Sequence, residues 1–178
     1  RLLRASPRDL VFSPNATYGL NVALHAATSI LSSRLAATAP TSSSGNGCVF
    51  MLDVGYGSVK KMAALAAERM GARLVIHPVR FPLADAADVV SQVAAALPAH
   101  TSLAIFDHVT SNTALVLPVT ELVALARARG ALVVVDGAHG MQSLDVDVGI
   151  IGADWYVTNC HKWLCSTKGV ALMHAREG

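Results

Sequence analysis

The chain has 178 residues, of which 53% are hydrophobic and 5% aromatic, and its formal net charge is +2. This length suits one hydrophobic core and therefore favours one domain. The lysines and arginines are scattered, and charged residues interrupt every long apolar run, so we expect neither a nucleic-acid-binding surface nor a membrane span.

The two ends of the sequence indicate part of a longer protein. The chain begins at Arg1 without an initiator methionine and ends at Gly178, just after a strand-like run. Its first residues, RLLRASPRDLVF, contain too short an apolar run for a signal peptide. Cys48, Cys160 and Cys165 form an odd set without the spacing of a zinc site, so we expect reduced thiols in a cytoplasmic protein.

Helix-like and strand-like patterns then alternate along the chain. Their apolar periodicity predicts helices at Thr17–Leu35, Ser58–Met70, Ala84–Leu97 and Val119–Arg129, and strands at Val49–Leu52, Leu74–Ile76, Leu103–Phe106 and Leu132–Val135. Gly71 and Gly130 suit helix C-termini, and Pro118 suits a first helical turn. The repeated units predict an α/β fold with a mostly parallel sheet between two layers of Ala-rich helices.

One segment interrupts the alternation. The run TAPTSSSGNG (Thr38–Gly47) contains small polar residues, glycine and proline, which bury little surface. We expect a flexible surface loop at 38–47, with a linker between two domains as the alternative.

The strongest chemical signal is an acid and a lysine in the last third of the chain. Asp136 directly follows an apolar strand, and Lys162 lies between His161 and Trp163 in the next strand-like run. Ligands bind beyond the carboxyl ends of parallel strands. Pyridoxal phosphate needs both groups there: a lysine holds its aldehyde as a Schiff base, and an acid pairs with its pyridinium nitrogen. We expect Trp163, with Trp155 and Tyr156 nearby, to surround Lys162 with apolar groups and so to lower its pKa.

Each of these residues also has a simpler interpretation when it is taken alone. Asp136 can cap a helix, and Lys162 can extend past the aromatic side chains to water. Backbone N–H groups and the Thr17 hydroxyl at the start of the first predicted helix can face a phosphate, or Asn15 and Thr17 can be ordinary helix caps.

Two further motifs suggest other sites. The run GYGSVKK, which follows a predicted strand, resembles the start of a dinucleotide-binding fingerprint. However, Lys60 stands where that fingerprint has its third glycine, and no ribose-binding acid follows the strand that ends near His77. His161 and Cys165 have the i, i+4 spacing of a metal-ligand pair, but no further ligands converge on them, so we predict no metal site.

Five segments that cover most of the chain carry a family resemblance. They are FSPNATYGLN (Phe12–Asn21), LDVGYGSVKK (Leu52–Lys61), FDHVTSNTALVLPV (Phe106–Val119), VVVDGAHG (Val133–Gly140) and GADWYVTNCHKWLCSTKG (Gly152–Gly169). In this order they resemble the class V aminotransferases, pyridoxal phosphate enzymes of fold type I, and particularly the isopenicillin N epimerase-like branch. The resemblance implies that residues 1–178 are the cofactor-binding large domain of a homodimer, without the family's C-terminal small domain.

The resemblance also implies roles at the reactive end of the cofactor. Lys162 would bind pyridoxal 5′-phosphate covalently and then transfer the α-proton of the substrate as a base and an acid. Asp136 would pair with the pyridinium nitrogen. His139 would lie near the phenolic oxygen, which Ser111 would also approach.

At the other end of the cofactor, the resemblance implies a phosphate site. Ala16 and Thr17 match the phosphate loop, and Asn159 and His161 match further phosphate contacts. Tyr56 stands where this branch carries an aromatic residue near the ring face, although the preceding Val-Gly pair differs from the usual His-Glu.

The implied activity is chemistry at the α-carbon of a small amino acid, with transamination, epimerisation and carbon–sulfur lysis all left open. We do not expect a fragment without the small domain to be active alone. A non-catalytic relative that uses the fold as an interaction module is one alternative, although it would need neither Asp136 nor Lys162. A dinucleotide-dependent oxidoreductase that binds through Gly55 and Gly57 is the other.

Overall fold

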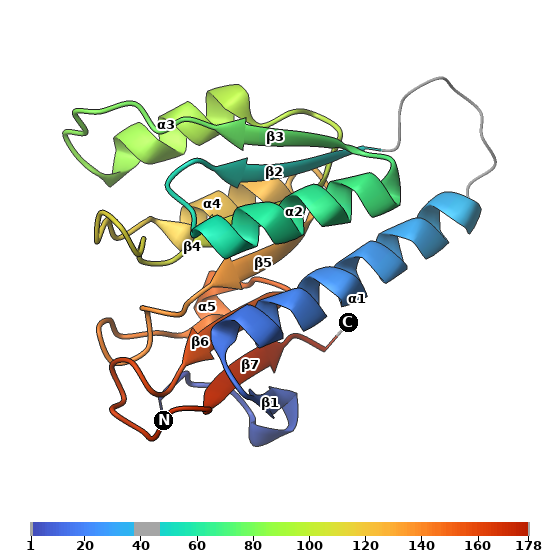
Figure 1. Cartoon of the computed structure of the whole chain (residues 1–178). Helices are drawn as coiled ribbons and strands as arrows, with labels where there is room; N and C mark the ends of the chain where they lie inside the picture. The colour runs from blue at the N-terminus through green and yellow to red at the C-terminus, as the bar shows by residue number, and fades with distance from the viewer. Residues whose placement is uncertain (1, 38–46, 178) are drawn as a thin grey trace.

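Seven strands form one sheet in the computed structural model, which describes residues 2–37 and 47–177 (Figure 1). The strands are β1 (Leu10–Ser13), β2 (Cys48–Leu52), β3 (Arg73–His77), β4 (Thr101–Asp107), β5 (Leu132–Asp136), β6 (Trp155–Asn159) and β7 (Ala171–Ala175). Their order across the sheet is β1-β7-β6-β5-β4-β2-β3. Strands β2 to β6 are parallel, whereas β7 is antiparallel to both of its neighbours, β6 and β1. The predicted α/β fold with a mostly parallel sheet is confirmed.

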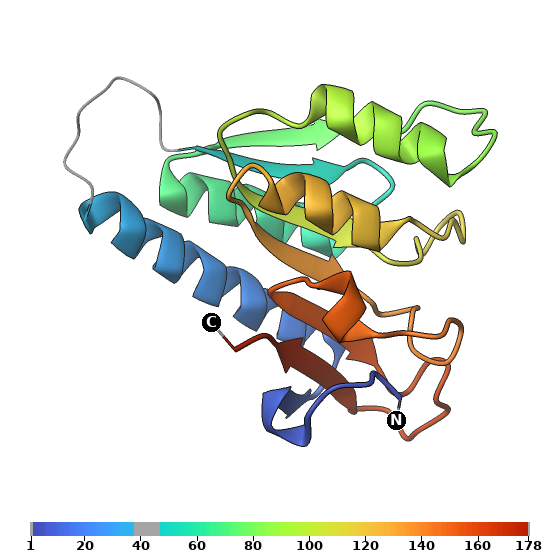
Figure 2. The same cartoon turned by 180° about the vertical axis from the view of Figure 1, so that it is seen from behind.

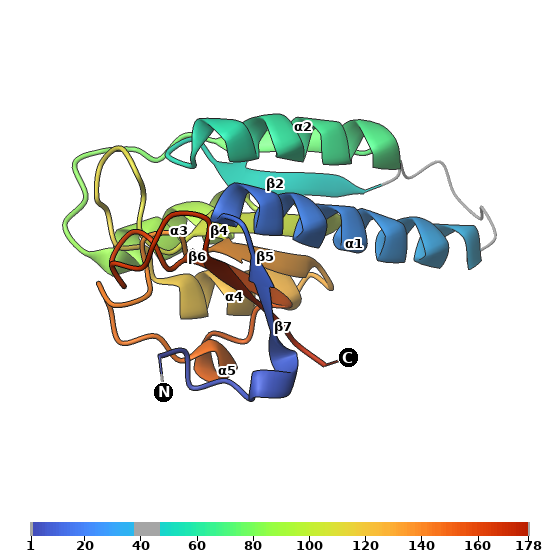
Figure 3. The same ribbon diagram turned by 60° about the horizontal axis from the view of Figure 1, so that its bottom comes forward.

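Helices cover both faces of the sheet. They are α1 (Ala16–Ala37), α2 (Gly57–Met70), α3 (Ala86–Ala96), α4 (Val119–Arg127) and α5 (Val148–Ile151), and a 3-10 helix, η1 (Pro7–Asp9), precedes β1. Helices α1 and α2 lie on the face seen in Figure 1, and α3, α4 and α5 lie on the opposite face, seen in Figure 2. Figure 3 shows the sheet between these two layers. No helix in the described residues is long and apolar enough to cross a bilayer.

The central strands are buried on both faces, and so they read in the sequence as continuous apolar runs. In β2, Val49 and Met51 pack toward α1 and α2, whereas Phe50 and Leu52 pack into the core under α3 and α4. Helix α1 lies close to β6 at Gly19, where a Cβ atom would be 2.7 Å from a methyl group of Val157. A side chain at this position would therefore push α1 away from the sheet.

The helix boundaries differ from the predicted ones by at most two residues, for local reasons. Helix α3 begins later than predicted because Asp85 caps it, accepting hydrogen bonds from the backbone N–H groups of Ala87 and Asp88. Helix α2 ends as predicted at Gly71, whose φ of 59° is left-handed. Pro118 precedes α4 as its N-cap and does not lie in the first turn. Residues 38–46 of the predicted loop lie outside the described residues.

Candidate active site

A pocket of about 170 Å³ opens where the carboxyl ends of β4, β5 and β6 meet the start of α1 and the loop between β2 and α2. It brings together all the residues that the sequence predicted for the site, which are Lys162, Asp136, His139, Ala16, Thr17, Ser111, Asn159, His161 and Tyr56. Asn15, Leu20, Asp107, Val109 and Ala138 complete its lining. The chemically active residues therefore gather at the edge of the sheet where ligands of parallel sheets bind.

Asp136 is the buried acid of this pocket. Asp136 is the last residue of β5 and is 5% exposed. Its Oδ1 accepts a hydrogen bond of 2.9 Å from the backbone N–H of Ala138. Burial raises the pKa of Asp136, whereas the Ala138 hydrogen bond and the charge of Lys162 act in the opposite direction. A carboxylate in this position favours a cationic partner in the pocket, because an isolated buried charge is costly.

Lys162 and His139 form the reactive contact of the site. The Nζ of Lys162 lies 2.9 Å from Nε2 of His139, and the indole N–H of Trp163 donates to Nδ1 of His139 over 3.2 Å. Because an indole can only donate, Nδ1 accepts, and the proton of a neutral imidazole therefore sits on Nε2. Nε2–H then donates to Lys162, which requires an uncharged amine. This hydrogen-bond pattern favours the nucleophilic form of the lysine.

Electrostatics favour the same protonation states. Partial burial lowers the pKa of Lys162, and the nearby Asp136 carboxylate opposes that shift. Burial also lowers the pKa of His139, and the charge of Lys162 lowers it further. The predicted direction of the Lys162 shift is confirmed.

Two details of the Lys162 prediction were wrong. Strand β6 ends at Asn159, and Lys162 lies in the turn that follows, not within a strand. Trp155 and Tyr156 are buried in the sheet, whereas Trp163 is 53% exposed. The lysine therefore owes its partial burial to the walls of the pocket and not to a surrounding aromatic cluster.

The start of α1 is tied to the end of β6. The side-chain oxygen of Asn159 accepts a hydrogen bond of 2.8 Å from the backbone N–H of Ala16, and Asn15 caps the helix by accepting from the N–H of Tyr18, also over 2.8 Å. The Ala16 N–H is therefore engaged within the protein. Thr17, by contrast, has no hydrogen-bond partner for its N–H or its hydroxyl in the described part of the chain.

His161 also has a defined orientation. Its Nδ1 lies 3.1 Å from the carbonyl oxygen of Val170, which can only accept, so Nδ1 carries the proton. The second ring nitrogen, Nε2, is then left for another partner. His161 lines the pocket, as predicted for a residue near the phosphate.

Asp107 is the site residue that our sequence analysis missed. It ends β4 directly beside Asp136, its register partner on β5, and it is 5% exposed. Burial and, secondly, the Asp136 charge raise the pKa of Asp107 to about 7. The signal that could have found it is the one used for Asp136, an acid directly after an apolar strand.

A buried pair of side chains packs behind Asp136. His108 Nδ1 and the Tyr156 hydroxyl lie 2.8 Å apart, and burial lowers the pKa of His108 to about 4. The Tyr156 ring fills the space beside two glycines: a Cβ atom at Gly137 or Gly140 would lie 2.2 Å from an atom of Tyr156. The glycines of the DGAHG segment therefore make room for this ring.

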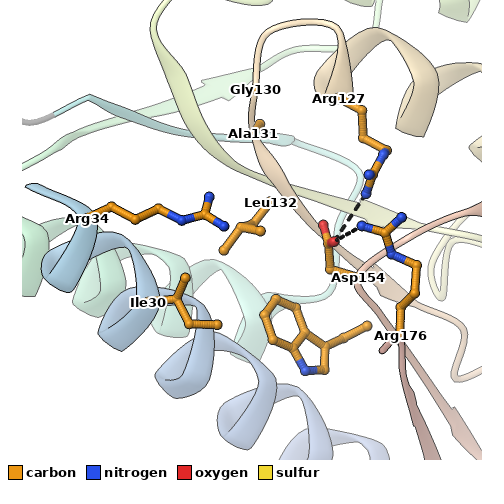
Figure 4. A pocket seen from close by; sticks show the side chains of 9 residues that line it. Ile30, Arg34, Arg127, Gly130, Ala131, Leu132, Asp154 and Arg176 are labelled. Carbon is orange, nitrogen blue, oxygen red and sulfur yellow. Dashed lines mark hydrogen bonds and ion pairs between the residues drawn. The ribbon is translucent and has the colours of Figure 1, made fainter. Parts of the chain in front are cut away.

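A second cavity, of about 370 Å³, lies at the opposite edge of the sheet, near the amino ends of β5 and β6. Figure 4 shows Arg127 and Arg176 both reaching the carboxylate of Asp154, at 3.1 and 2.8 Å, with Arg34 on α1 across the cavity. The cavity contains neither a lysine nor a histidine. The candidate active site is therefore the pocket at the carboxyl edge. No group of metal-binding side chains gathers anywhere in the described residues.

Comparisons with known proteins find similar sequences and folds. Residues 1–178 match the family model Aminotransferase class-V. The putative L-cysteine desulfhydrase 1 of Oryza sativa subsp. japonica is 40% identical over 136 residues, which are 72% of this chain and 28% of that protein. The isopenicillin N epimerase of Streptomyces clavuligerus is 34% identical over 180 residues, covering 100% of this chain and 41% of the epimerase. The chain thus spans less than half the length of these relatives.

Solved structures share the fold. The cystine C-S lyase C-DES, in complex with its reaction product cysteine persulfide, superposes with a TM-score of 0.79 at 22% identity, covering 98% of this chain and 43% of that one. The apo cysteine desulfurase of Thermococcus onnurineus NA1 gives a TM-score of 0.76 at 20% identity, covering 99% of this chain and 40% of that one.

Proposed function

The chain belongs to the class V aminotransferase family, and from that premise we propose that it is the large, cofactor-binding domain of a pyridoxal 5′-phosphate enzyme acting at the α-carbon of an amino acid. The observation that carries the proposal is the pocket in which the buried Asp136 faces a lysine whose hydrogen bond from His139 requires an uncharged amine. When bound, the cofactor would supply an aldehyde for an amine and a ring that withdraws electrons from the α-carbon.

The residues of the pocket fit this group in chemistry and position. Asp136 would hold the protonated ring nitrogen, which supplies the cation that a buried carboxylate favours. Thr17 offers an N–H and a hydroxyl to the phosphate at the start of α1, a helix of 22 residues whose dipole favours an anion there. The Ala16 N–H already binds Asn159, so we propose that Asn159 supports the phosphate site by fixing α1.

Lys162 and His139 would handle the substrate proton. An uncharged Lys162 amine would hold the cofactor through its aldehyde, and the same nitrogen would accept the α-proton of the substrate. His139 would hold that amine in place through its hydrogen bond of 2.9 Å and keep it unprotonated. Ser111 and Tyr56, which also line the pocket, are proposed to contact the phenolic oxygen and the ring face.

For the substrate we propose a small sulfur-containing amino acid, on the basis of relatives named as L-cysteine desulfhydrases at 40% and 37% identity. Carbon–sulfur lysis and epimerisation both begin with removal of the α-proton, so the pocket serves either reaction. Epimerisation is the second candidate because the isopenicillin N epimerases align over 98% to 100% of the chain. Release of sulfide from L-cysteine by the full-length enzyme would favour lysis, and inversion at the α-carbon would favour epimerisation.

The dinucleotide alternative loses support from the structure. A dinucleotide fingerprint needs a glycine where the helix packs closely on the strand. Here the position of that glycine is occupied by Lys60 on α2.

We further propose a cytoplasmic homodimer. Phe12 and Tyr18 are 76% and 55% exposed beside the start of α1, and large exposed apolar side chains favour a subunit interface. The three cysteines are all free thiols, which suits a reducing compartment. Light scattering of the full-length protein would measure its oligomeric state.

The test is covalent capture of the cofactor. The full-length protein is incubated with pyridoxal phosphate, reduced with borohydride and mapped by mass spectrometry, and the label is expected on Lys162. Lys162→Ala should lose the label, whereas the control Lys168→Ala, on the same exposed segment, should keep it. Label on another lysine, or none on the folded full-length protein, would contradict the proposal.

A further inference from the structure

We propose that Asp107 is a positioning residue of this site, which fixes the loop between β2 and α2 and thereby holds Tyr56 against the pocket. This role deepens the proposed function, since the pocket that it shapes is the proposed cofactor site. Asp107 is well placed for it, because β4 lies between β5, which carries Asp136, and β2, which leads into the loop.

The loop passes directly against the Asp107 carboxyl group. The backbone N–H of Tyr56 faces this carboxyl closely enough to lower its pKa. One residue earlier, a Cβ atom on Gly55 would lie only 3.0 Å from Oδ2 of Asp107. The loop can approach Asp107 this closely because residue 55 has no side chain.

Tyr56 depends on this backbone contact for its placement. It is the N-cap residue of α2, but its side chain makes no capping hydrogen bond, and it is 46% exposed. Tyr56 nevertheless lines the pocket. Since no side-chain hydrogen bond fixes the ring within the described residues, the position of the backbone decides where it lies.

Burial and, secondly, the charge of Asp136 raise the pKa of Asp107 to about 7, whereas the charge of Lys60 lowers it. Asp136 on β5 is its acidic neighbour, and Lys60 on α2 is the cation that acts on it. The other titratable groups that line the same pocket are Lys162, His139, His161 and Tyr56. Two carboxylates on adjacent strand ends in a buried site resist simultaneous ionisation, so an uncharged Asp107 can hold the loop without repelling Asp136. An asparagine would have the same shape and still present an oxygen to the Tyr56 N–H.

The first measurement is hydrogen exchange of residues 53–57 in the cofactor-free, full-length protein. In Asp107→Ala, the Tyr56 amide should exchange several-fold faster, because its N–H loses the carboxyl that it faces and the loop loses the side chain that it packs against. Asp107→Asn should keep the wild-type rate. Asp53→Asn is the matched control, because Asp53 begins the same loop and its carboxylate binds the N–H of Val79, outside the pocket.

The second measurement is affinity for pyridoxal phosphate, followed by absorbance. Asp107→Ala should bind on the order of tenfold more weakly, while Asp107→Asn and Asp53→Asn should stay close to wild type. Unchanged exchange in Asp107→Ala, or exchange in Asp107→Asn as fast as in Asp107→Ala, would overturn the proposal. Because the exchange measurement needs no cofactor, it tests the positioning role even if capture at Lys162 fails. Circular dichroism of Asp107→Ala checks that the variant folds, and Asp107→Asn keeps the test valid if it does not.

Discussion

Asp154, at the edge of the sheet opposite the active site, allows a test of which contacts stabilise the fold (Figure 4). Its Oδ2 accepts a hydrogen bond of 2.7 Å from the buried backbone N–H of Val133. Its Oδ1 accepts hydrogen bonds from the guanidinium groups of Arg127 and Arg176. A hydrogen bond from a buried donor to a charged acceptor contributes roughly 1.5–3 kcal/mol. The two arginine side chains are 37% and 42% exposed, and ion pairs of that kind contribute about 0–1 kcal/mol each.

We therefore expect Asp154→Ala to lower the free energy of unfolding by about 2–4 kcal/mol, mostly because the Val133 N–H is left without an acceptor. Asp154→Asn should cost only about 1 kcal/mol, since the amide oxygen can still serve Val133 while the arginine contacts are lost. Arg127→Ala is the control for the ion pair and should cost about as little.

The assay is urea unfolding of the cofactor-free, full-length protein, followed by circular dichroism at low and at 1 M salt. Added salt should change the Asp154→Ala difference only slightly, because screening weakens exposed ion pairs but not the buried hydrogen bond. If Asp154→Asn were as destabilising as Asp154→Ala, or if high salt removed the difference, the ion pairs would be the main contribution and our reasoning would be refuted.

Three further predictions concern the residues around the site. Gly137→Ala would place a Cβ atom 2.2 Å from the Tyr156 ring, so we expect a loss of about 3 kcal/mol in urea unfolding, and wild-type stability would contradict this packing. Tyr156→Phe leaves the buried His108 without its partner and should cost about 1–3 kcal/mol by the same assay; a neutral effect would mean that His108 finds another partner. Because the native pKa of Asp107 is raised from 3.8 to about 7, its contribution to stability is present below pH 4 and is lost as the pH rises to 7. Between pH 4 and 7, the free energy of unfolding should therefore fall by roughly 4 kcal/mol more in the wild type than in Asp107→Asn. Melting temperatures that fall equally with pH in the wild type and in Asp107→Asn would refute this prediction.

The central fold could be predicted because buried strands and helix ends have recognisable residue patterns. Strand β5 reads as an unbroken apolar run because both of its faces are covered, and helix α2 ends at a left-handed glycine. Strand β1 is different: its four residues are partly or fully exposed, so no periodic pattern marks it. Helix α5 has only four residues, too few to show a helical period.

Site residues could be predicted one by one, but their contacts could not. Asp136 is recognisable because it ends a buried strand, and Asp107 follows the same rule on β4. The hydrogen bond between His139 and Lys162 joins residues that are 23 positions apart, and the fold of the intervening segment, which contains α5 and β6, brings them together. Local sequence patterns contain no information on such a contact. The roles of these residues toward the cofactor stay predictions.

The position of α1 has a consequence for how the protein is made. Its apolar face, with Leu20, Leu24 and Leu31, packs against β5, β6 and β7, which the ribosome synthesises well after α1. At typical translation rates, these strands follow α1 after roughly 5 to 30 seconds. During that time α1 can pack against α2 but not against these strands, and the leucines that face them are open to aggregation or to a chaperone. The nascent chain must therefore wait for β5 and β6 before the pocket at the start of α1 can form.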